Sequence, residues 1–115
     1  MIKKETMRKT LTGNSSIEEL EEIRKEDREL YPKAWSNKAI TYQHMGDIGE
    51  ALMCFDRAID LDKNYSLAYY NKGVLLMENR DYSPALECFT KTVEIDAKNE
   101  NAKLNAEACI HALGN

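Results

Sequence analysis

Apolar side chains along residues 32–113 recur every three or four positions, the spacing of helices that each bury one face. The first stretch of this kind is expected to end at Gly46, and its face carries Trp35, Lys38, Ala39, Tyr42 and Met45. Asp47 follows with Glu50 three residues later, which is the capping-box pattern at the start of a second helix. The spacing of three to four continues through Ala51, Leu52, Phe55, Ala58, Ile59 and Asp62.

This pair of helices is repeated after 34 residues, because residues 32–65 align with residues 66–99 without a gap. Nine positions are identical between the copies: Ala34/Ala68, Asn37/Asn71, Lys38/Lys72, Asp47/Asp81, Ala51/Ala85, Leu52/Leu86, Cys54/Cys88, Phe55/Phe89 and Asp62/Asp96. A third copy begins at residue 100 and stops after half a unit, with Ala102 and Asn105 in register. The chain is therefore expected to be all-α, built from antiparallel helix pairs.

The second copy differs from the first at the turn between its helices. The turn is expected at Asn79-Arg80-Asp81, and Ser83 before Pro84 is expected to cap the following helix with proline at its first position. In both copies small residues are expected where the helix axes approach closely, beside the rings that fill the remaining space. The small residues are Ala39, Gly73, Ala51 and Ala85, and the rings are Trp35, Tyr69, Phe55 and Phe89.

These residues resemble the tetratricopeptide repeat, a 34-residue helix–turn–helix with the pattern W-x2-L-G-x2-Y, then A-x3-F, then P. The first copy offers Trp35, Ala39, Tyr42, Ala51 and Phe55, and the second offers Tyr69, Gly73, Ala85 and Phe89. Departures from the pattern are Lys38 and Lys72 for the leucine, Leu76 for the second tyrosine, and Lys63 and Ala97 for the proline. The resemblance implies a short right-handed α-solenoid. The pentatricopeptide repeat, which reads RNA, is disfavoured by the period of 34 and by the acidic body of the chain.

The flanks complete the expected organisation. Residues 1–14 are expected to be a basic, disordered arm. Residues 15–31 are expected to be an N-terminal capping helix, in which Ile17, Leu20, Ile23 and Leu30 follow an amphipathic pattern. Two repeats follow at residues 32–65 and 66–99, and residues 100–115 form a C-terminal capping helix, which is half a repeat.

Charge narrows the class of partner. The chain of 115 residues has 16 Lys and Arg against 20 Asp and Glu, a net charge of −4. Residues 1–13 carry four bases and one acid, so the remaining twelve bases and nineteen acids leave the body at −7. An acidic body argues against nucleic acid, which requires clustered cations. No apolar run approaches a membrane span, and the N-terminus lacks the apolar stretch of a signal peptide, so a cytoplasmic location is expected.

The side chains give no sign of an enzyme, a metal site or a cofactor. The sequence lacks nucleophile-elbow, metalloprotease, phosphate-loop and dinucleotide motifs, and its three cysteines include no CxxC pair. Cys54 and Cys88 occupy equivalent repeat positions, which favours packing over redox chemistry. His44 and His111 are too few for a convincing catalytic or metal cluster.

The resemblance implies that the first helix of each pair lines a concave groove, which binds an extended peptide or a partner helix. The groove positions carried over are Lys33, Ser36, Asn37, Ile40, Gln43, His44, Leu67, Tyr70, Asn71, Val74, Met77, Glu78, Asn101, Asn105 and Ala108, with Ala112 beyond them. Among these, Asn37, Asn71 and Asn105 recur at 34-residue intervals. A carboxamide donates and accepts hydrogen bonds at once, so this asparagine row could pair with a peptide backbone or could equally support the scaffold.

One subfamily grips the C-terminal carboxylate of heat-shock chaperones with Lys, Arg and Asn. Its positions fall here on Ser36, Ile40, Asn71, Asn101 and Asn105, where only Asn71 matches. No cation is available at these positions for a charge-assisted bond, so binding of chaperone tails is not expected. Two functions remain from the sequence: a non-catalytic adaptor that holds a protein segment in the groove, or a self-association module, a homodimer for example, that uses its terminal helices.

Overall fold

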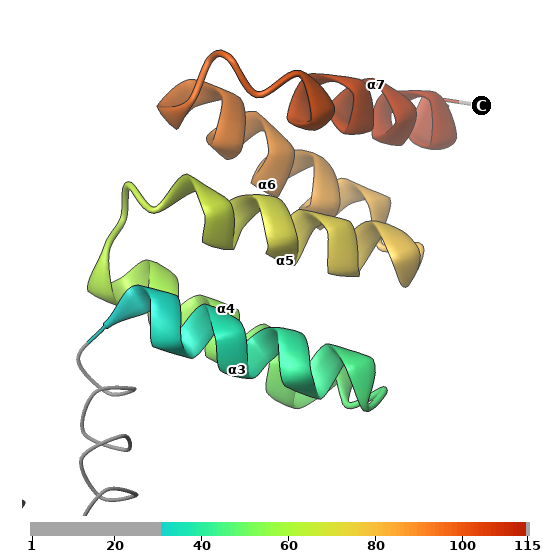
Figure 1. Ribbon diagram of the computed structural model, residues 1–115. Coiled ribbons are helices and arrows are strands. Elements are labelled where there is room, and N and C mark those ends of the chain that lie inside the picture. The colour runs from blue at the N-terminus through green and yellow to red at the C-terminus, as the bar shows by residue number, and fades with distance from the viewer. Residues whose placement is uncertain (1–30, 115) are drawn as a thin grey trace, which may run out of the picture.

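The computed structural model describes residues 31–114, which contain five helices and no strand (Figure 1). The expectation of an all-α helical repeat is confirmed. The expected arm at 1–14 and nearly all of the expected capping helix at 15–31 lie outside the described residues. The helices are α3 (Pro32–His44), α4 (Ile48–Leu61), α5 (Ser66–Glu78), α6 (Tyr82–Ile95) and α7 (Glu100–Gly114).

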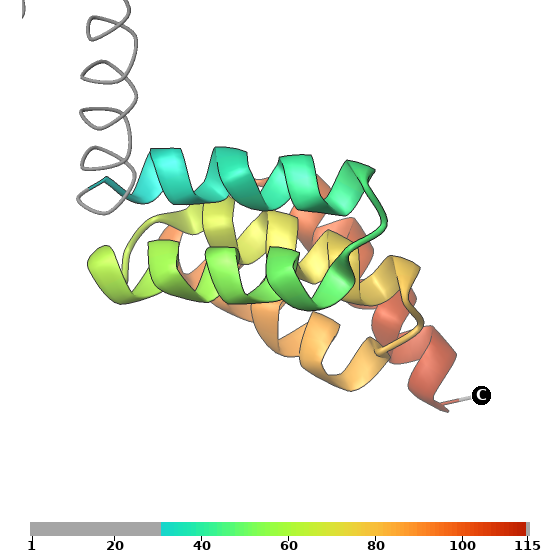
Figure 2. The same cartoon turned by 90° about the horizontal axis from the view of Figure 1, so that it is seen from below.

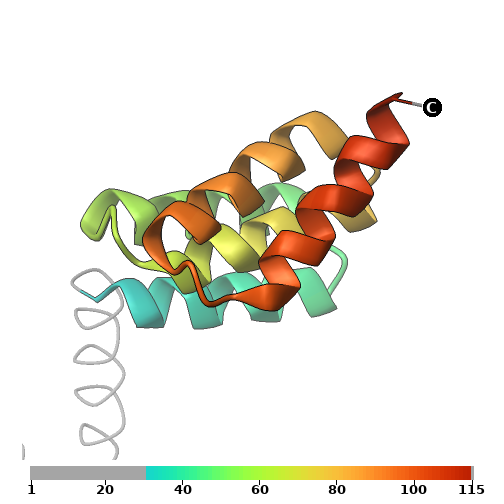
Figure 3. The ribbon, with the colours of Figure 1, turned by 90° about the horizontal axis from the view of Figure 1, so that it is seen from above.

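The helices stack in chain order as antiparallel neighbours (Figures 1 and 2). Helix α3 packs along α4, α5 along α6, and α7 against α6, while α4 joins the two pairs by contacting α5. Seen along the stack, α7 crosses α3 at an angle, so each pair is turned relative to the one before it (Figure 3). Two apolar clusters follow from this arrangement, one within α3 and α4 that also receives Leu75, and one shared by α5, α6 and α7.

Small and large side chains alternate in these clusters as the sequence predicts. Phe55 and Phe89 are fully buried, and so are Ala39, Ala51 and Ala85 across from them. A buried phenylalanine contributes about 2–3 kcal/mol of hydrophobic stabilisation, so these rings dominate the two clusters. Met45 is the exception on the predicted face of α3. It is 69% exposed, because the helix ends at His44 and Met45 lies in the turn.

The turns inside the two repeats have the same geometry but different residues. Gly46 has φ +79° and Arg80 has φ +65°, both in the left-handed region. In each turn the next amide reaches back into the preceding helix: Asp47 N–H donates to the Tyr42 carbonyl at 2.9 Å, and Asp81 N–H donates to the Leu76 carbonyl at 2.8 Å. This is a Schellman-type ending, which favours glycine, so Arg80 adopts its conformation at a cost.

The second helix of each repeat begins differently. The predicted cap of α4 is confirmed, since Asp47 Oδ1 accepts the Glu50 N–H at 3.4 Å. The predicted cap of α6 at Ser83 is wrong, because α6 begins at Tyr82 with Asp81 at the cap position. The residue three after Asp81 is Pro84, which has no N–H to donate, so the Asp81 carboxylate instead accepts from Asn79 Nδ2 at 2.8 Å.

Candidate binding surface on the first helices

The first helices of the repeats, α3, α5 and α7, contact one another in order and carry the predicted groove positions. We call the surface that these positions form the inner surface. Two hydrogen bonds join successive helices across it. Gln43 Nε2 donates to Glu78 Oε1 at 3.3 Å, and Asn105 Nδ2 donates to Tyr70 Oη at 3.4 Å. In each bond the two residues are 35 positions apart in the chain, one more than the repeat length of 34. The two bonds therefore join successive helices at nearly equivalent repeat positions.

The three asparagines of the row differ in whether their side chains form hydrogen bonds within the protein. Asn105 is half-buried and uses its amide nitrogen on Tyr70, whose ring packs edge-on against Phe89 with centroids 5.8 Å apart. Asn37 is exposed and Asn71 is half-buried, and neither side chain forms a hydrogen bond with any part of residues 31–114. Two of the three carboxamides therefore retain their full capacity to donate and accept.

One predicted groove residue does not belong to an accessible surface. Ser36 is 1% exposed, and its hydroxyl has no hydrogen-bond partner. It lies one position before the exposed Asn37 and turns into the helix pack, so the transfer of Ser36 from the family pattern is wrong for this chain. In the second repeat the same position holds Tyr70, which is long enough to reach α7.

The other predicted groove residues are accessible in part or in full. Ile40, Tyr70, Val74 and Met77 are half-buried and pack against the two apolar clusters, so they offer only their outer edges. Leu67 is 49% exposed. Gln43 is half-buried, and the exposed remainder is Lys33, His44, Glu78, Asn101 and Ala108. Only one lysine and one glutamate are included, so the inner surface offers amides and apolar edges rather than charge.

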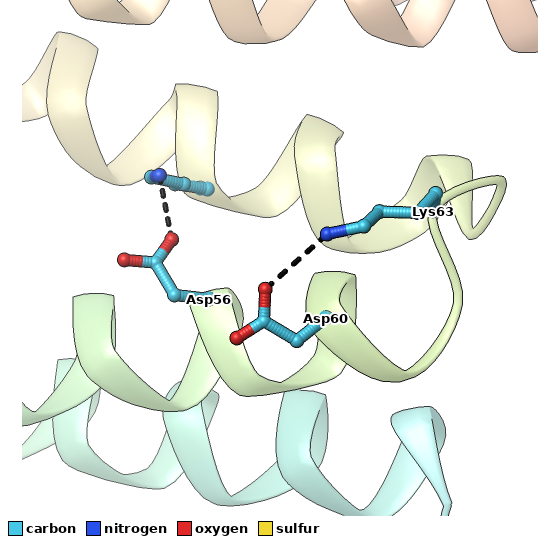
Figure 4. A network of polar contacts seen from close by, with 4 residues as sticks. Asp56, Asp60 and Lys63 are labelled. Atoms are coloured by element: carbon cyan, nitrogen blue, oxygen red, sulfur yellow. Dashed lines mark hydrogen bonds and ion pairs between the residues drawn. The ribbon is translucent and has the colours of Figure 1, made fainter.

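An ion pair joins the two repeats away from the inner surface. Lys72 Nζ on α5 lies 2.6 Å from Asp56 Oδ1 on α4, close to a second pair between Lys63 and Asp60 (Figure 4). Burial disfavours the Lys72 ammonium, but the hydrogen bond and the charge of Asp56 together outweigh it and raise the pKa of Lys72. The sequence did not reveal this pair, because position 90 holds threonine where position 56 holds aspartate and no repeat signal marks it.

The cysteines are buried thiols, in agreement with a packing role. Burial raises the pKa of Cys54, Cys88 and Cys109, and that of Cys88 reaches about 11. A nucleophilic or metal-binding cysteine requires a lowered pKa. Within residues 31–114 there is no group of three or more His, Cys, Asp or Glu that could hold a metal ion, and none of the helices described there is long and apolar enough to cross a membrane.

A hollow of about 300 Å³ lies at the start of the stack, and none of the predicted groove residues lines it. It is lined by Trp35 from α3 and by Arg57, Asp60 and Leu61 from α4. Lys38 Nζ lies 5.2 Å from the centre of the Trp35 ring, and the Arg57 guanidinium carbon lies 5.9 Å from it. Two cations thus flank one ring.

Comparison with known proteins places this architecture. The tetratricopeptide repeat family model matches residues 32–65 and 66–99, which are the two copies found in the sequence. The chain belongs to the tetratricopeptide repeat family. Proteins of this family are generally non-catalytic modules that bind other proteins, and the described helices are one example of the scaffold.

Among solved structures, the crystal structure of MamA protein is similar to this chain, with a TM-score of 0.74 and 23% sequence identity. The match covers 88% of this chain and 55% of the MamA chain, so this chain spans about half the length of that relative. At this identity the likeness supports the helical repeat fold alone. No curated protein matches the sequence.

Proposed function

We propose that this tetratricopeptide repeat protein is a non-catalytic adaptor that binds an extended peptide segment in a groove along α3, α5 and α7. The observation that carries the proposal is the pair of unbonded carboxamides of Asn37 and Asn71 at equivalent positions of adjacent inner helices. A peptide backbone presents N–H and C=O groups at regular intervals, and each carboxamide can satisfy one of each. The outer edges of Val74 and Met77 supply apolar contact beside them.

The partner proposed here is a neutral or mixed-charge segment rather than a chaperone tail. The positions that would grip a terminal carboxylate hold the buried Ser36, the half-buried Ile40 and asparagines, none of which is a cation. Nucleic acid and membrane surfaces bind clusters of lysine and arginine, which this surface lacks, so neither is proposed as its partner.

The proposal is tested with peptides selected from a random-sequence phage library on the full chain and then measured by fluorescence anisotropy. Asn37→Ala and Asn71→Ala should each weaken binding about fivefold, because each removes a hydrogen bond worth about 1 kcal/mol. Lys91→Ala, on the exposed surface of α6, is the matched control and should bind as the parent does. Equal affinity for the parent and both asparagine variants would contradict the proposal.

Self-association is the second candidate, and exposed apolar residues on α7 favour it. Leu104 is 61% exposed, Ile110 55% and Leu113 50%. A homodimer that buries them should appear as a concentration-dependent species in sedimentation velocity and should disappear in Ile110→Glu. A single monomeric species across a wide concentration range would refute this candidate.

A further inference from the structure

The end of the described stack at α3 differs from the junction between the repeats in one respect: within residues 31–114 no preceding helix packs against α3 on that side. In the second repeat, Lys72 faces the preceding helix α4 and pairs with Asp56. In the first repeat, Lys38 holds the same position, one period of 34 residues earlier. Within residues 31–114 no carboxylate forms an ion pair with Lys38 or with its neighbour Arg57, and both cations lie against the Trp35 ring.

This end also exposes apolar surface. Tyr31 is 56% exposed and Leu61 45%, and Leu61 and Trp35 line the hollow of about 300 Å³. Asp60, which also lines the hollow, pairs with Lys63 at 3.4 Å, and among residues 31–114 this leaves Lys38 and Arg57 without an ion-pair partner. Apolar surface that surrounds a hollow and carries cations without ion-pair partners fits an occupant that is both apolar and acidic.

The chain itself supplies such an occupant directly before the hollow. Residues 17–30 carry seven acids and three bases, a net charge of −4, and they lead into Tyr31, four residues before Trp35 of the hollow. Ile23 and Leu30 belong to the apolar stripe of this segment, and Asp27 falls between them at helical spacing. An aspartate four residues after an apolar residue is also the arrangement on α4, where Leu52 packs against the next cluster and Asp56 pairs with Lys72.

We infer that residues 17–30 of the same chain dock on this open end as a helix, with Ile23 and Leu30 over the Trp35 hollow and Asp27 paired with Lys38 or Arg57. The segment takes the place that α4 takes for the second repeat, and it covers the end face without using the inner surface. This inference does not depend on the proposed peptide binding.

Trp35 is the one tryptophan of the chain, so its fluorescence reports on the hollow without labelling. In the full chain, Ile23→Asn and Asp27→Lys should each shift the Trp35 emission to the red and raise its quenching constant with acrylamide. Glu29→Lys is the matched control, because it makes the same change of charge two residues away but on the helix face opposite Ile23 and Asp27. It should leave both quantities as in the parent.

The two variants test different parts of the inference, and neither alters a residue of the two repeats. Unchanged Trp35 emission and quenching in Ile23→Asn would overturn the docking. An effect of Ile23→Asn without an effect of Asp27→Lys would overturn the ion pair. If shielding of Trp35 in the parent appears only as the protein concentration rises, with a dimer in sedimentation, the occupant is a second copy and the intramolecular docking is wrong.

Discussion

The two repeats share one backbone plan, yet they fill their centres differently. Ala39 is fully buried in the first repeat, whereas a Cβ added to Gly73 would lie 2.8 Å from Phe89 Cε1. This difference is matched by a second one three residues earlier, where the first repeat has the small Ser36 and the second repeat has Tyr70. The Tyr70 ring packs edge-on against Phe89, so the extra ring volume is compensated by the missing methyl group at Gly73.

The comparison shows that matching repeat positions are not interchangeable one at a time. Exchanging a residue between the copies tests how far each environment has adapted to its own side chain. Substitutions at three pairs of equivalent positions probe these differences: Cys54 and Cys88, Ala39 and Gly73, and Gly46 and Arg80.

The largest effect is expected from the equivalent cysteines at alkaline pH. Burial raises the pKa of Cys88 from 9.0 to about 11, so the folded protein holds a proton that the unfolded chain has already lost. The protonated Cys88 thiol contributes about 2 kcal/mol to the free energy of unfolding. This contribution is fully present below pH 9 and is lost as the pH rises toward 11. Urea unfolding between pH 8 and 11 should therefore show a decline that Cys88→Ala reduces.

Cys54 provides the comparison for that measurement. Burial also raises its pKa, while Lys38 and Arg57 oppose the increase and Glu50 adds to it, and the increase is smaller than that at Cys88. Cys54→Ala should consequently flatten the alkaline decline less than Cys88→Ala does. The same slope in both variants would show that the two sites do not differ.

The second effect concerns the small residue in each repeat. Alanine in place of glycine gains about 1 kcal/mol of helix propensity, but the contact with the buried Phe89 ring costs more. Gly73→Ala should lower the free energy of unfolding by a net 1–2 kcal/mol, roughly, in chemical denaturation. In the first repeat alanine is the preferred residue instead, and Ala39→Gly should also destabilise the protein, by about 1 kcal/mol. A stabilising Gly73→Ala would show that Phe89 moves aside freely.

The smallest effect is expected at the left-handed turns. Arg80→Gly should stabilise the protein by roughly 0.5–1 kcal/mol, because glycine adopts φ +65° without strain. Gly46→Ala should destabilise it by about 1 kcal/mol, and a clash is not the reason, since nothing lies within 4 Å of the added Cβ. Thermal unfolding of both variants and of the parent measures the two changes in stability. A change of the same sign in both variants would contradict this prediction.

The sequence by itself determined the number and order of the repeat helices. The period of 34, the capping pattern of Asp47 and Glu50, and the left-handed Gly46 are local signals, and a helix pair depends mostly on contacts close in the chain. The same local reasoning failed at Ser83, because the choice between Ser83 and Asp81 as cap depends on how the Schellman-type turn before them closes.

Only the tertiary structure decided which predicted groove residues are accessible and what joins one repeat to the next. Ser36 and Asn37 are neighbours in sequence, yet one is buried and the other exposed, because their side chains point about 100° apart around the helix. The Lys72–Asp56 pair and the Trp35 hollow bring together residues from different helices, without a repeated sequence signal. Such contacts depend on the distance between packed helices, a quantity that periodicity along one chain does not contain.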